Sequence, residues 1–208
     1  TLMGRDITFD QQGKYNLRIR KTLETVYLHY EGDRECEEFK AFEVYLKRIW
    51  FASGIHHHYG CEKFKPGFSE EYFYHLIGEE LLPIKRGETK EDLMRQLESI
   101  LFDPEVMPKR VNQTDGEDLV LTSACNFYED VTQEEVERFY AKMKNTDNPN
   151  PPSYGLNSKL TKRNNEVVEL TWKEDGLYGE TIREIVSWLL KAQKYAENEG
   201  QKHVIDLL

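Results

Sequence analysis

The spacing of apolar residues predicts helices over most of the first 144 positions. Apolar side chains recur there at steps of three and four residues, which places them on one face of a helix. The predicted helices cover 16–30, 35–51, 69–80, 89–101 and 132–144. Ser69 is followed by two glutamates, while Thr89 and Thr132 each have an acidic residue three positions later. These are signatures of helix N-termini, and the last two are typical of a capping box.

The pattern changes from helical to alternating after an Asn- and Pro-rich loop at 147–153. Polar and apolar residues alternate over 156–162 and 166–173, and residues 163–165 predict the turn of a β-hairpin. Its predicted apolar face consists of Val168, Leu170 and Trp172. A two-stranded hairpin is marginally stable alone, so we expect a helix or another sheet to cover it.

A long helix is predicted at 179–198, and another from Glu199 onward. The residues expected to point inward from the long helix are Ile182, Ile185, Val186, Leu189 and Leu190. The sequence therefore predicts an α+β fold that is predominantly helical, with one small antiparallel element. We expect it to be helical over 1–146, to form a loop and hairpin over 147–175, and to be helical over 176–208.

Composition narrows the classes of partner. The 208 residues carry a formal net charge of −10, from 38 Asp and Glu against 28 Lys and Arg. Because such a chain repels phosphate, we expect no nucleic-acid partner. No apolar run approaches the roughly 20 residues that cross a bilayer, so we expect no membrane partner. Cys36, Cys61 and Cys125 show no CxxC spacing, which fits a reducing compartment and predicts a cytoplasmic location.

Three consecutive histidines are the most conspicuous candidates for metal chemistry. On a strand, His56 and His58 share one face while His57 points away, and on a helix none of the three are neighbours. Further ligands would have to come from elsewhere, and the other histidines lie in unrelated segments. A structural or peptide-contacting loop is the favoured interpretation, and a small metal-binding protein is an alternative.

Catalytic motifs are absent from the sequence. A zincin needs two histidines one helical turn apart with a glutamate as general base, yet no histidine here is followed by glutamate. No nucleophile elbow or phosphate loop is present. Cys125 with a distant histidine would form a dyad, but a free cysteine is usually a small buried apolar residue. We expect no catalytic residue and no metal ligand in this chain.

The segment 51–68 mixes glycine, histidine, proline and aromatic residues, a composition that often lines ligand clefts. Residues 50–66, with the sequence WFASGIHHHYGCEKFKP, resemble the N-terminal lobe of dipeptidyl peptidase III, in particular its bacterial, Bacteroides-like branch. Further similar segments are 4–6, 15–21, 109–113, 118–126 and 153–160. The resemblance runs over essentially the whole chain.

This resemblance implies a zinc metallopeptidase that removes dipeptides from the free N-termini of short peptides. Members of the family have two lobes around a wide cleft. One lobe holds zinc through a His-Glu-x-x-Gly-His helix and a further glutamate. The other, N-terminal lobe is a small β-barrel with helices that supplies part of the peptide site. This chain resembles part of that second lobe, so we expect zinc to be held by the remainder of the parent enzyme.

The resemblance also implies which residues contact peptide. The family loop that matches His58, Tyr59 and Gly60 lines the subsites for the first residues of the peptide. Tyr59 would offer an aromatic wall, and Gly60 would let the peptide approach the backbone closely. Eukaryotic members carry smaller or non-His residues at 56–58, so the resemblance assigns no role to the imidazoles.

The expected partners are therefore a short peptide substrate and the remainder of the parent enzyme. The chain starts without Met and stops inside an amphipathic pattern, so we expect a fragment that is inactive by itself. An incomplete barrel would leave a sheet edge open to dimerisation. A stand-alone, non-catalytic helical interaction module is the alternative from another functional class.

Overall fold

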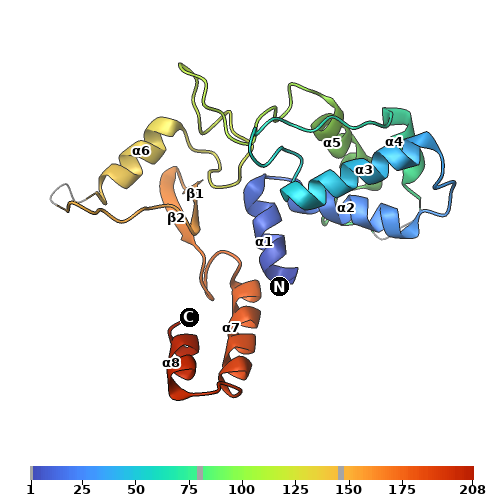
Figure 1. The fold of residues 1–208 in the computed structure, drawn as a ribbon. Helices are drawn as coiled ribbons and strands as arrows, with labels where there is room; N and C mark the ends of the chain where they lie inside the picture. The colour runs from blue at the N-terminus through green and yellow to red at the C-terminus, as the bar shows by residue number, and fades with distance from the viewer. Residues whose placement is uncertain (1, 79–81, 145–147) are drawn as a thin grey trace. The chain divides into compact units, whose positions relative to one another are not determined.

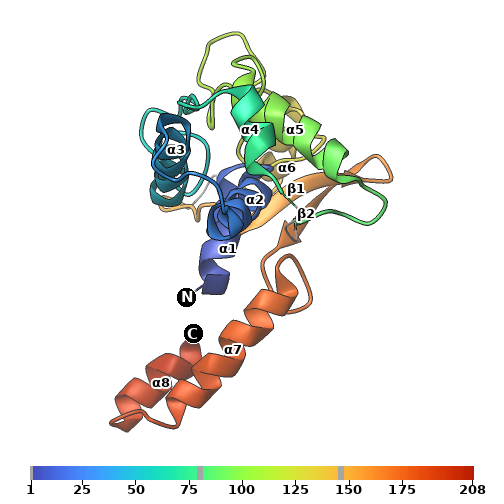
Figure 2. The same ribbon diagram turned by 90° about the vertical axis from the view of Figure 1, so that its right-hand side faces the viewer.

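The computed structural model describes residues 2–78, 82–144 and 148–208, and it is an α+β, mostly helical fold (Figures 1 and 2). It consists of two compact units, described separately below. The core unit is Arg5–Asn126, and the hairpin unit is Phe127–Leu208 with the first residues of the chain. The described residues contain no helix that is long and apolar enough to cross a membrane.

The core unit is built from helices that bury their apolar faces against one another. These helices are α1 (Leu2–Gln12), α2 (Asn16–His29), α3 (Glu37–Ala52), α4 (Glu70–Leu76) and α5 (Lys90–Phe102). In Figure 1, α2 lies along α3, and α4 lies beside α5. The fully buried side chains at the centre include Phe9, Leu23, Phe42, Tyr45, Leu46, Ile49, Phe73, Leu93 and Leu97.

The predicted helices of this unit are confirmed with small shifts of their ends. Helix α4 ends at Leu76, and the predicted extension to position 80 reaches residues outside the described part of the chain. Helix α1 was not predicted. Its buried residues Ile7 and Phe9 are two positions apart, and no apolar residue follows Phe9 within the helix, so no extended apolar stripe marked residues 2–12.

The predicted N-caps are confirmed in the structure. The Ser69 hydroxyl accepts a hydrogen bond from the Tyr72 N–H at 3.2 Å. Thr89 forms a full capping box with Asp92, in which each residue's side chain accepts from the other's backbone N–H at 3.1 Å. Thr132 and Glu135 form the same motif at the start of α6. Each cap satisfies helix N–H groups that would otherwise lack a partner.

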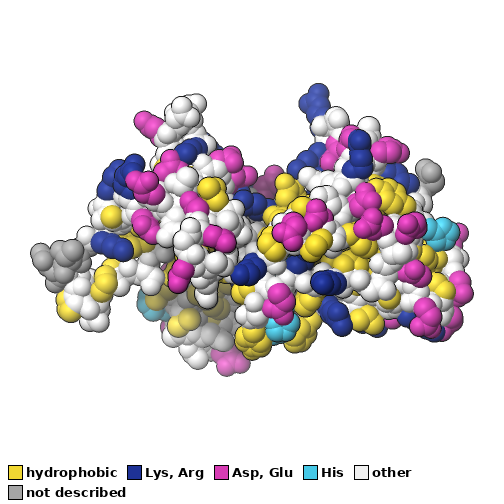
Figure 3. Space-filling model, turned by 90° about the horizontal axis from the view of Figure 1, so that it is seen from above, with side chains coloured by type: hydrophobic (Ala, Val, Ile, Leu, Met, Phe, Trp, Pro, Cys, Tyr) yellow, Lys and Arg dark blue, Asp and Glu magenta, His cyan; other side chains and the backbone are white. Residues whose placement is uncertain are grey.

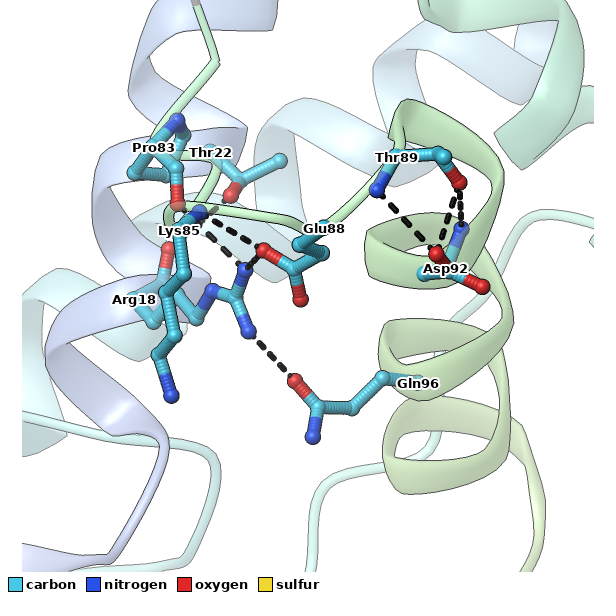
Figure 4. Close-up of polar contacts among 8 residues, drawn as sticks. All are labelled: Arg18, Thr22, Pro83, Lys85, Glu88, Thr89, Asp92 and Gln96. Atoms are coloured by element: carbon cyan, nitrogen blue, oxygen red, sulfur yellow. Dashed lines mark hydrogen bonds and ion pairs between the residues drawn. The ribbon is translucent and has the colours of Figure 1, made fainter.

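A half-buried arginine connects α2 to the segment that precedes α5 (Figure 4). Arg18 donates to the Gln96 side chain at 2.6 Å and also pairs with the Glu88 carboxylate. The Arg18 guanidinium, together with the Lys85 N–H, holds the pKa of Glu88 below its usual value. Because both partners are largely shielded from water, removing either would leave an uncompensated charge.

The hairpin unit begins with α6 (Gln133–Ala141), followed by the strands β1 (Ser158–Arg163) and β2 (Glu166–Thr171). The strands pair antiparallel, with Arg163 opposite Glu166. Asn164 and Asn165 form the turn, with φ angles of 51° and 65°. This left-handed conformation is the one that Asn adopts readily in two-residue hairpins. The predicted turn therefore included one residue too many, because Arg163 belongs to the strand. Of the predicted loop 147–153, position 147 lies outside the described residues.

The face of the hairpin that contacts α6 differs from the predicted one. Leu160 is fully buried and lies opposite Glu169, so both side chains are on the same face. The Tyr140 hydroxyl from α6 donates to the Glu169 carboxylate at 3.0 Å. The predicted apolar face, Val168, Leu170 and Trp172, is only half-buried. Alternation along β2 alone missed this, because the deepest apolar residue lies on β1.

Helices α7 (Gly179–Gln193) and α8 (Glu199–Leu207) lie side by side (Figure 2). Neither helix contains a buried residue. The expectation that Ile185 and Leu190 point inward was wrong, because both are exposed. The other residues predicted to point inward, Ile182, Val186 and Leu189, are half-buried, so the apolar stripe of this helical hairpin is partly covered.

Candidate functional site

The loop formed by residues 54–64, called the His loop below, follows directly from the end of α3. Ser53 ends that helix in the left-handed conformation, and the Gly54 N–H bonds back to the Ile49 carbonyl at 3.1 Å. The two sides of the loop then pair as short extended segments. The Phe64 N–H donates to the Ile55 carbonyl at 2.8 Å, and His56 lies opposite Lys63. The loop is thus a closed, hydrogen-bonded structure.

The tip of the His loop is organised around the His57 ring. Its Nδ1 accepts hydrogen bonds from the Tyr59 N–H at 3.3 Å and the Gly60 N–H at 3.0 Å. The His57 carbonyl accepts from the Cys61 N–H at 3.0 Å, and Cys61 has a φ of 64°. Because Nδ1 accepts two bonds, it carries no proton in this arrangement. His57 therefore has a structural role in shaping the turn.

His56 points into the protein and is 2% exposed. Its Nε2 lies 2.8 Å from the Met107 carbonyl, which can only accept, so Nε2 carries the proton. Burial lowers the pKa of His56 to about 4. The ring is neutral at physiological pH, and its Nε2 is already occupied by a hydrogen bond. His56 fixes the base of the loop against the segment that follows α5.

The three histidines do not alternate as they would on a strand. The His57 and His58 rings are stacked, with centroids 4.9 Å apart, while His56 is buried. Only His56 has an extended partner, and the chain turns from His58 onward, so the two-residue period ends there. Across residues 2–78, 82–144 and 148–208, no three His, Cys, Asp or Glu side chains are grouped to hold a metal ion.

An aromatic surface covers the outside of the His loop. The His58 ring lies 4.2 Å from the Tyr59 ring and 5.2 Å from the Phe51 ring, centroid to centroid. Phe51 and Tyr59 are 80% and 84% exposed. Single exposed apolar side chains are common, but a cluster of exposed rings is typical of a surface that contacts a ligand or a partner. Phe51, His57, His58 and Tyr59 are called the aromatic surface below.

The space beside Gly60 is bordered by the end of the Glu62 side chain, which is 64% exposed and can move aside. A Cβ atom at this position would lie 2.0 Å from the Glu62 carboxylate oxygen Oε2. The Glu62 side chain thus occupies the space beside the Gly60 backbone.

Two basic residues hold the far side of the loop. Arg110 donates through Nη2 to the His58 carbonyl at 3.3 Å and to the Cys61 sulfur at 3.4 Å. The Lys63 ammonium donates to the Ile100 carbonyl in the last turn of α5 at 3.0 Å, and to the carbonyls of Asp103 and Val106 just after the helix, the latter at 2.7 Å. A cation at a helix C-terminus also complements the helix dipole. Desolvation lowers the pKa of Lys63, and neighbouring Asp103 opposes this.

Sequence reasoning missed a polar cavity of about 460 Å³ in the same unit. Asn112 lies in its wall, and its side chain bonds to Glu117 at 2.5 Å, to Thr122 at 2.9 Å and to the Thr114 hydroxyl at 2.8 Å. These residues are within ten positions of Asn112, so the polar sequence of 112–118, with its Asn, Thr, Asp and Gly residues, was the available signal. A second cavity of about 430 Å³ includes Glu62 and Lys63 of the His loop with Phe102 and three prolines.

Comparison with known proteins adds no assignment for this chain. Neither a scan against protein-family models nor a search of curated proteins finds a match.

Proposed function

We propose that this chain forms one wall of the peptide-binding cleft of a zinc dipeptidyl peptidase, and that the zinc is held by another part of the parent enzyme. The supporting sequence feature is the resemblance of residues 50–66 to dipeptidyl peptidase III. The supporting structural observation is that a firmly anchored loop from this same segment presents Tyr59 almost fully to solvent.

The geometry of the loop suits peptide contact. A rigid loop loses little conformational entropy when it binds, so its exposed rings give their contact energy to the complex. Tyr and Phe rings bury large areas and stack on peptide planes and side chains. The His57 and Gly60 interactions fix where Tyr59 projects. Tyr59 with Phe51 and His58 would form the wall, and Gly60 would border it.

The residues present do not fit a catalytic zinc. His56 is buried and bonded to Met107, and His57 Nδ1 accepts two backbone bonds. A zinc site needs three or four converging ligands, and the described side chains contain no such group. No hydrolytic step is therefore assigned to this chain. We expect the purified chain to show no hydrolysis of dipeptidyl-naphthylamides, and chelator-sensitive hydrolysis would contradict the proposal.

The peptide contact can be tested directly by NMR. A 15N-labelled sample would be titrated with a pentapeptide that has a free amino terminus. We expect the amide signals of Tyr59, Gly60 and Cys61 to shift, with a Kd on the order of 1 mM, because a single cleft wall gives few contacts. Tyr59→Ala should abolish these shifts. Tyr195→Ala is the matched control, since Tyr195 is 85% exposed but lies in the hairpin unit.

Two results would contradict the peptide-wall proposal. One is a set of shifts confined to residues outside the aromatic surface. The other is equal peptide affinity in the Tyr59→Ala and Tyr195→Ala variants. Reading the gene beyond the codon for Leu208 supplies an independent check, because a His-Glu-x-x-Gly-His segment is required there.

A second candidate function is supported by the hairpin unit. Trp188 on α7 and Leu207 on α8 are both exposed, as are several other apolar residues of these helices. Exposed apolar stripes on paired helices are typical of surfaces that bind a partner. A non-catalytic interaction module therefore remains the alternative. A gene that ends at Leu208, with no zinc motif beyond it, would favour it over the peptidase.

A further inference from the structure

A buried amide lies beneath the His loop, at the start of α2. Asn16 is 2% exposed. Its Oδ1 accepts a hydrogen bond from the Ile55 N–H at 3.3 Å, and its Nδ2 finds no acceptor among the described residues. Reversing the amide would set Nδ2 against the Ile55 N–H, two donors facing each other, so the orientation is fixed. A buried polar side chain is normally satisfied by several hydrogen bonds. Because the Asn16 side chain makes only this one with the described residues, we expect that bond to have a specific role.

Two glycines make room for this amide. A Cβ on Gly13 would lie 2.6 Å from Asn16 Nδ2, and a Cβ on Gly54 would lie 2.0 Å from the same atom. Both distances are too short for any side chain. Neither glycine is among those with positive φ, so close approach rather than backbone freedom is the reason for glycine here. The turn before α2 and the start of the His loop therefore pack directly on the two sides of the Asn16 amide.

The bond from Asn16 continues into the loop through the backbone. The Ile55 N–H donates to Asn16 Oδ1, and the Ile55 carbonyl accepts a hydrogen bond from the Phe64 N–H at 2.8 Å. The next residue, His56, is anchored to Met107. Both extended sides of the loop are thus connected to Asn16 through Ile55. Tyr59 stands at the tip of this arrangement.

We infer that Asn16 is the positioning residue of the His loop, and that it sets the location of the aromatic surface from beneath. Asn16 meets the loop at its start, through the hydrogen bond from the Ile55 N–H and through packing against the Gly54 backbone. The consequence for peptide affinity rests on the proposed function, whereas the consequence for loop position does not. The two consequences are therefore measured separately.

Loop position is measured without peptide, from the amide signals of Tyr59, Gly60 and Cys61. Asn16→Ala removes the bond to Ile55, so these signals should shift and broaden. Asn16→Asp keeps the shape and the accepting oxygen and changes only the unpartnered Nδ2. It should lower stability by burying a carboxylate but keep the loop signals close to those of the wild type. If Asn16→Ala does not fold, Asn16→Ser, whose hydroxyl is too short to reach Ile55, takes its place.

Thr22→Val is the matched control for a loss of stability alone. Thr22 is fully buried in α2, and its hydroxyl donates to the Arg18 carbonyl at 3.0 Å, away from the loop. This variant should leave the loop signals unchanged. Two outcomes would overturn the inference. One is that the loop signals stay unchanged in Asn16→Ala. The other is that they change as much in Thr22→Val or in Asn16→Asp as they do in Asn16→Ala.

The glycine contact supplies a second test. Gly54→Ala should displace the loop signals, because its Cβ meets the Asn16 amide. Asn16→Ala removes that amide. Gly54→Ala should therefore displace the loop signals less when it is introduced into the Asn16→Ala variant than when it is introduced into the wild type. An equal effect in both backgrounds would contradict a direct contact.

Peptide affinity is measured last. If the chain binds the pentapeptide, Asn16→Ala should raise its Kd by about tenfold, because the loop is no longer held in its binding position. Asn16→Asp and Thr22→Val should bind as the wild type does. A wild-type chain that binds no peptide would contradict the proposed function and leave the loop-position result standing, so the two failures are distinguishable.

Discussion

Helices α5 and α7 carry similar apolar stripes and reach opposite outcomes. In α5, Leu93, Leu97 and Leu101 are buried in the core unit. In α7 no residue is buried, and Leu190 is exposed. A stripe of apolar residues predicts a helix and the face that could be buried, but burial also needs a second apolar surface. Helix α5 has one in the core cluster, whereas within the hairpin unit α7 packs against the nine-residue helix α8.

The same contrast extends to the two units as wholes. The core unit contains the whole apolar cluster, to which each of its five helices contributes. The hairpin unit buries few apolar side chains, among them Val131, Val136 and Leu160. Because apolar burial is the main favourable term in folding, the stability of this chain is concentrated in the unit that carries the His loop.

The largest expected effect on stability comes from replacing a leucine by alanine in α5, compared with the same replacement in α7. Leu97→Ala in α5 should lower the free energy of unfolding by roughly 3–5 kcal/mol, because it leaves a cavity in the core. Leu190→Ala in α7 should cost less than about 1 kcal/mol, since the side chain is already in water. Hydrogen exchange followed by mass spectrometry measures the change in each unit separately.

The location of the effect matters as much as its size. We expect Leu97→Ala to speed exchange across the core unit, and Leu190→Ala to affect α7 and α8 alone. Equal losses for the two variants would mean that the α7 stripe is covered in solution, for example by a second copy. A concentration-dependent exchange rate in α7 would then identify self-association.

A second prediction concerns the pH dependence of the stability of the core unit. Burial lowers the pKa of His56 from 6.5 to about 4. The unfolded chain therefore binds a proton between pH 6.5 and pH 4 that the folded chain does not, so stability falls as the pH falls through this window. Urea unfolding of the core unit should show a His56 contribution on the order of 3 kcal/mol lost between pH 7 and pH 4.

The matching variants isolate this contribution. His56→Gln keeps a donor for Met107 but does not titrate, so its stability should fall less steeply over the same window. Ile55→Val, a neighbouring buried change without a titrating group, should lower the curve by about 1 kcal/mol at every pH. Parallel curves for wild type and His56→Gln would refute the buried, neutral imidazole.

The sequence alone predicted the local structure well where the local physics is self-contained. Helix caps at Ser69, Thr89 and Thr132 were found because each motif satisfies its own backbone groups within three residues. The Asn-containing hairpin turn was found for the same reason. The face of the hairpin that contacts α6 was missed, because Leu160 and Glu169 become neighbours only through strand pairing.

The candidate site shows the same limit. Its location in the aromatic-rich segment was accessible from composition, and the sequence nominated Tyr59, which is exposed. The role of His57 in the turn and the burial of His56 were not accessible, because they depend on Met107 and on backbone bonds across the loop. Asn16 lies 39 positions from Ile55, so no local pattern could connect them.

The smallest expected effect compares one motif in the two units. Thr89 and Thr132 are the N-cap residues of matching capping boxes, and each side chain accepts a hydrogen bond from the N3 backbone N–H. Thr89→Ala and Thr132→Ala each remove that accepting side chain. Each should cost about 1 kcal/mol, because the lost bonds are alike. The Thr89 change should appear as a loss of stability of the core unit, since α5 supplies core residues. The Thr132 change should appear as faster hydrogen exchange within α6, which contributes only Val136 to the buried residues, with the core unit unchanged.

Thr22→Ser, which keeps its hydroxyl bond to Arg18, serves as the control for a threonine change without loss of a cap. If Thr132→Ala changed exchange across the core unit as much as Thr89→Ala does, the two units would have to unfold together, and their different apolar burial would not give them different stabilities.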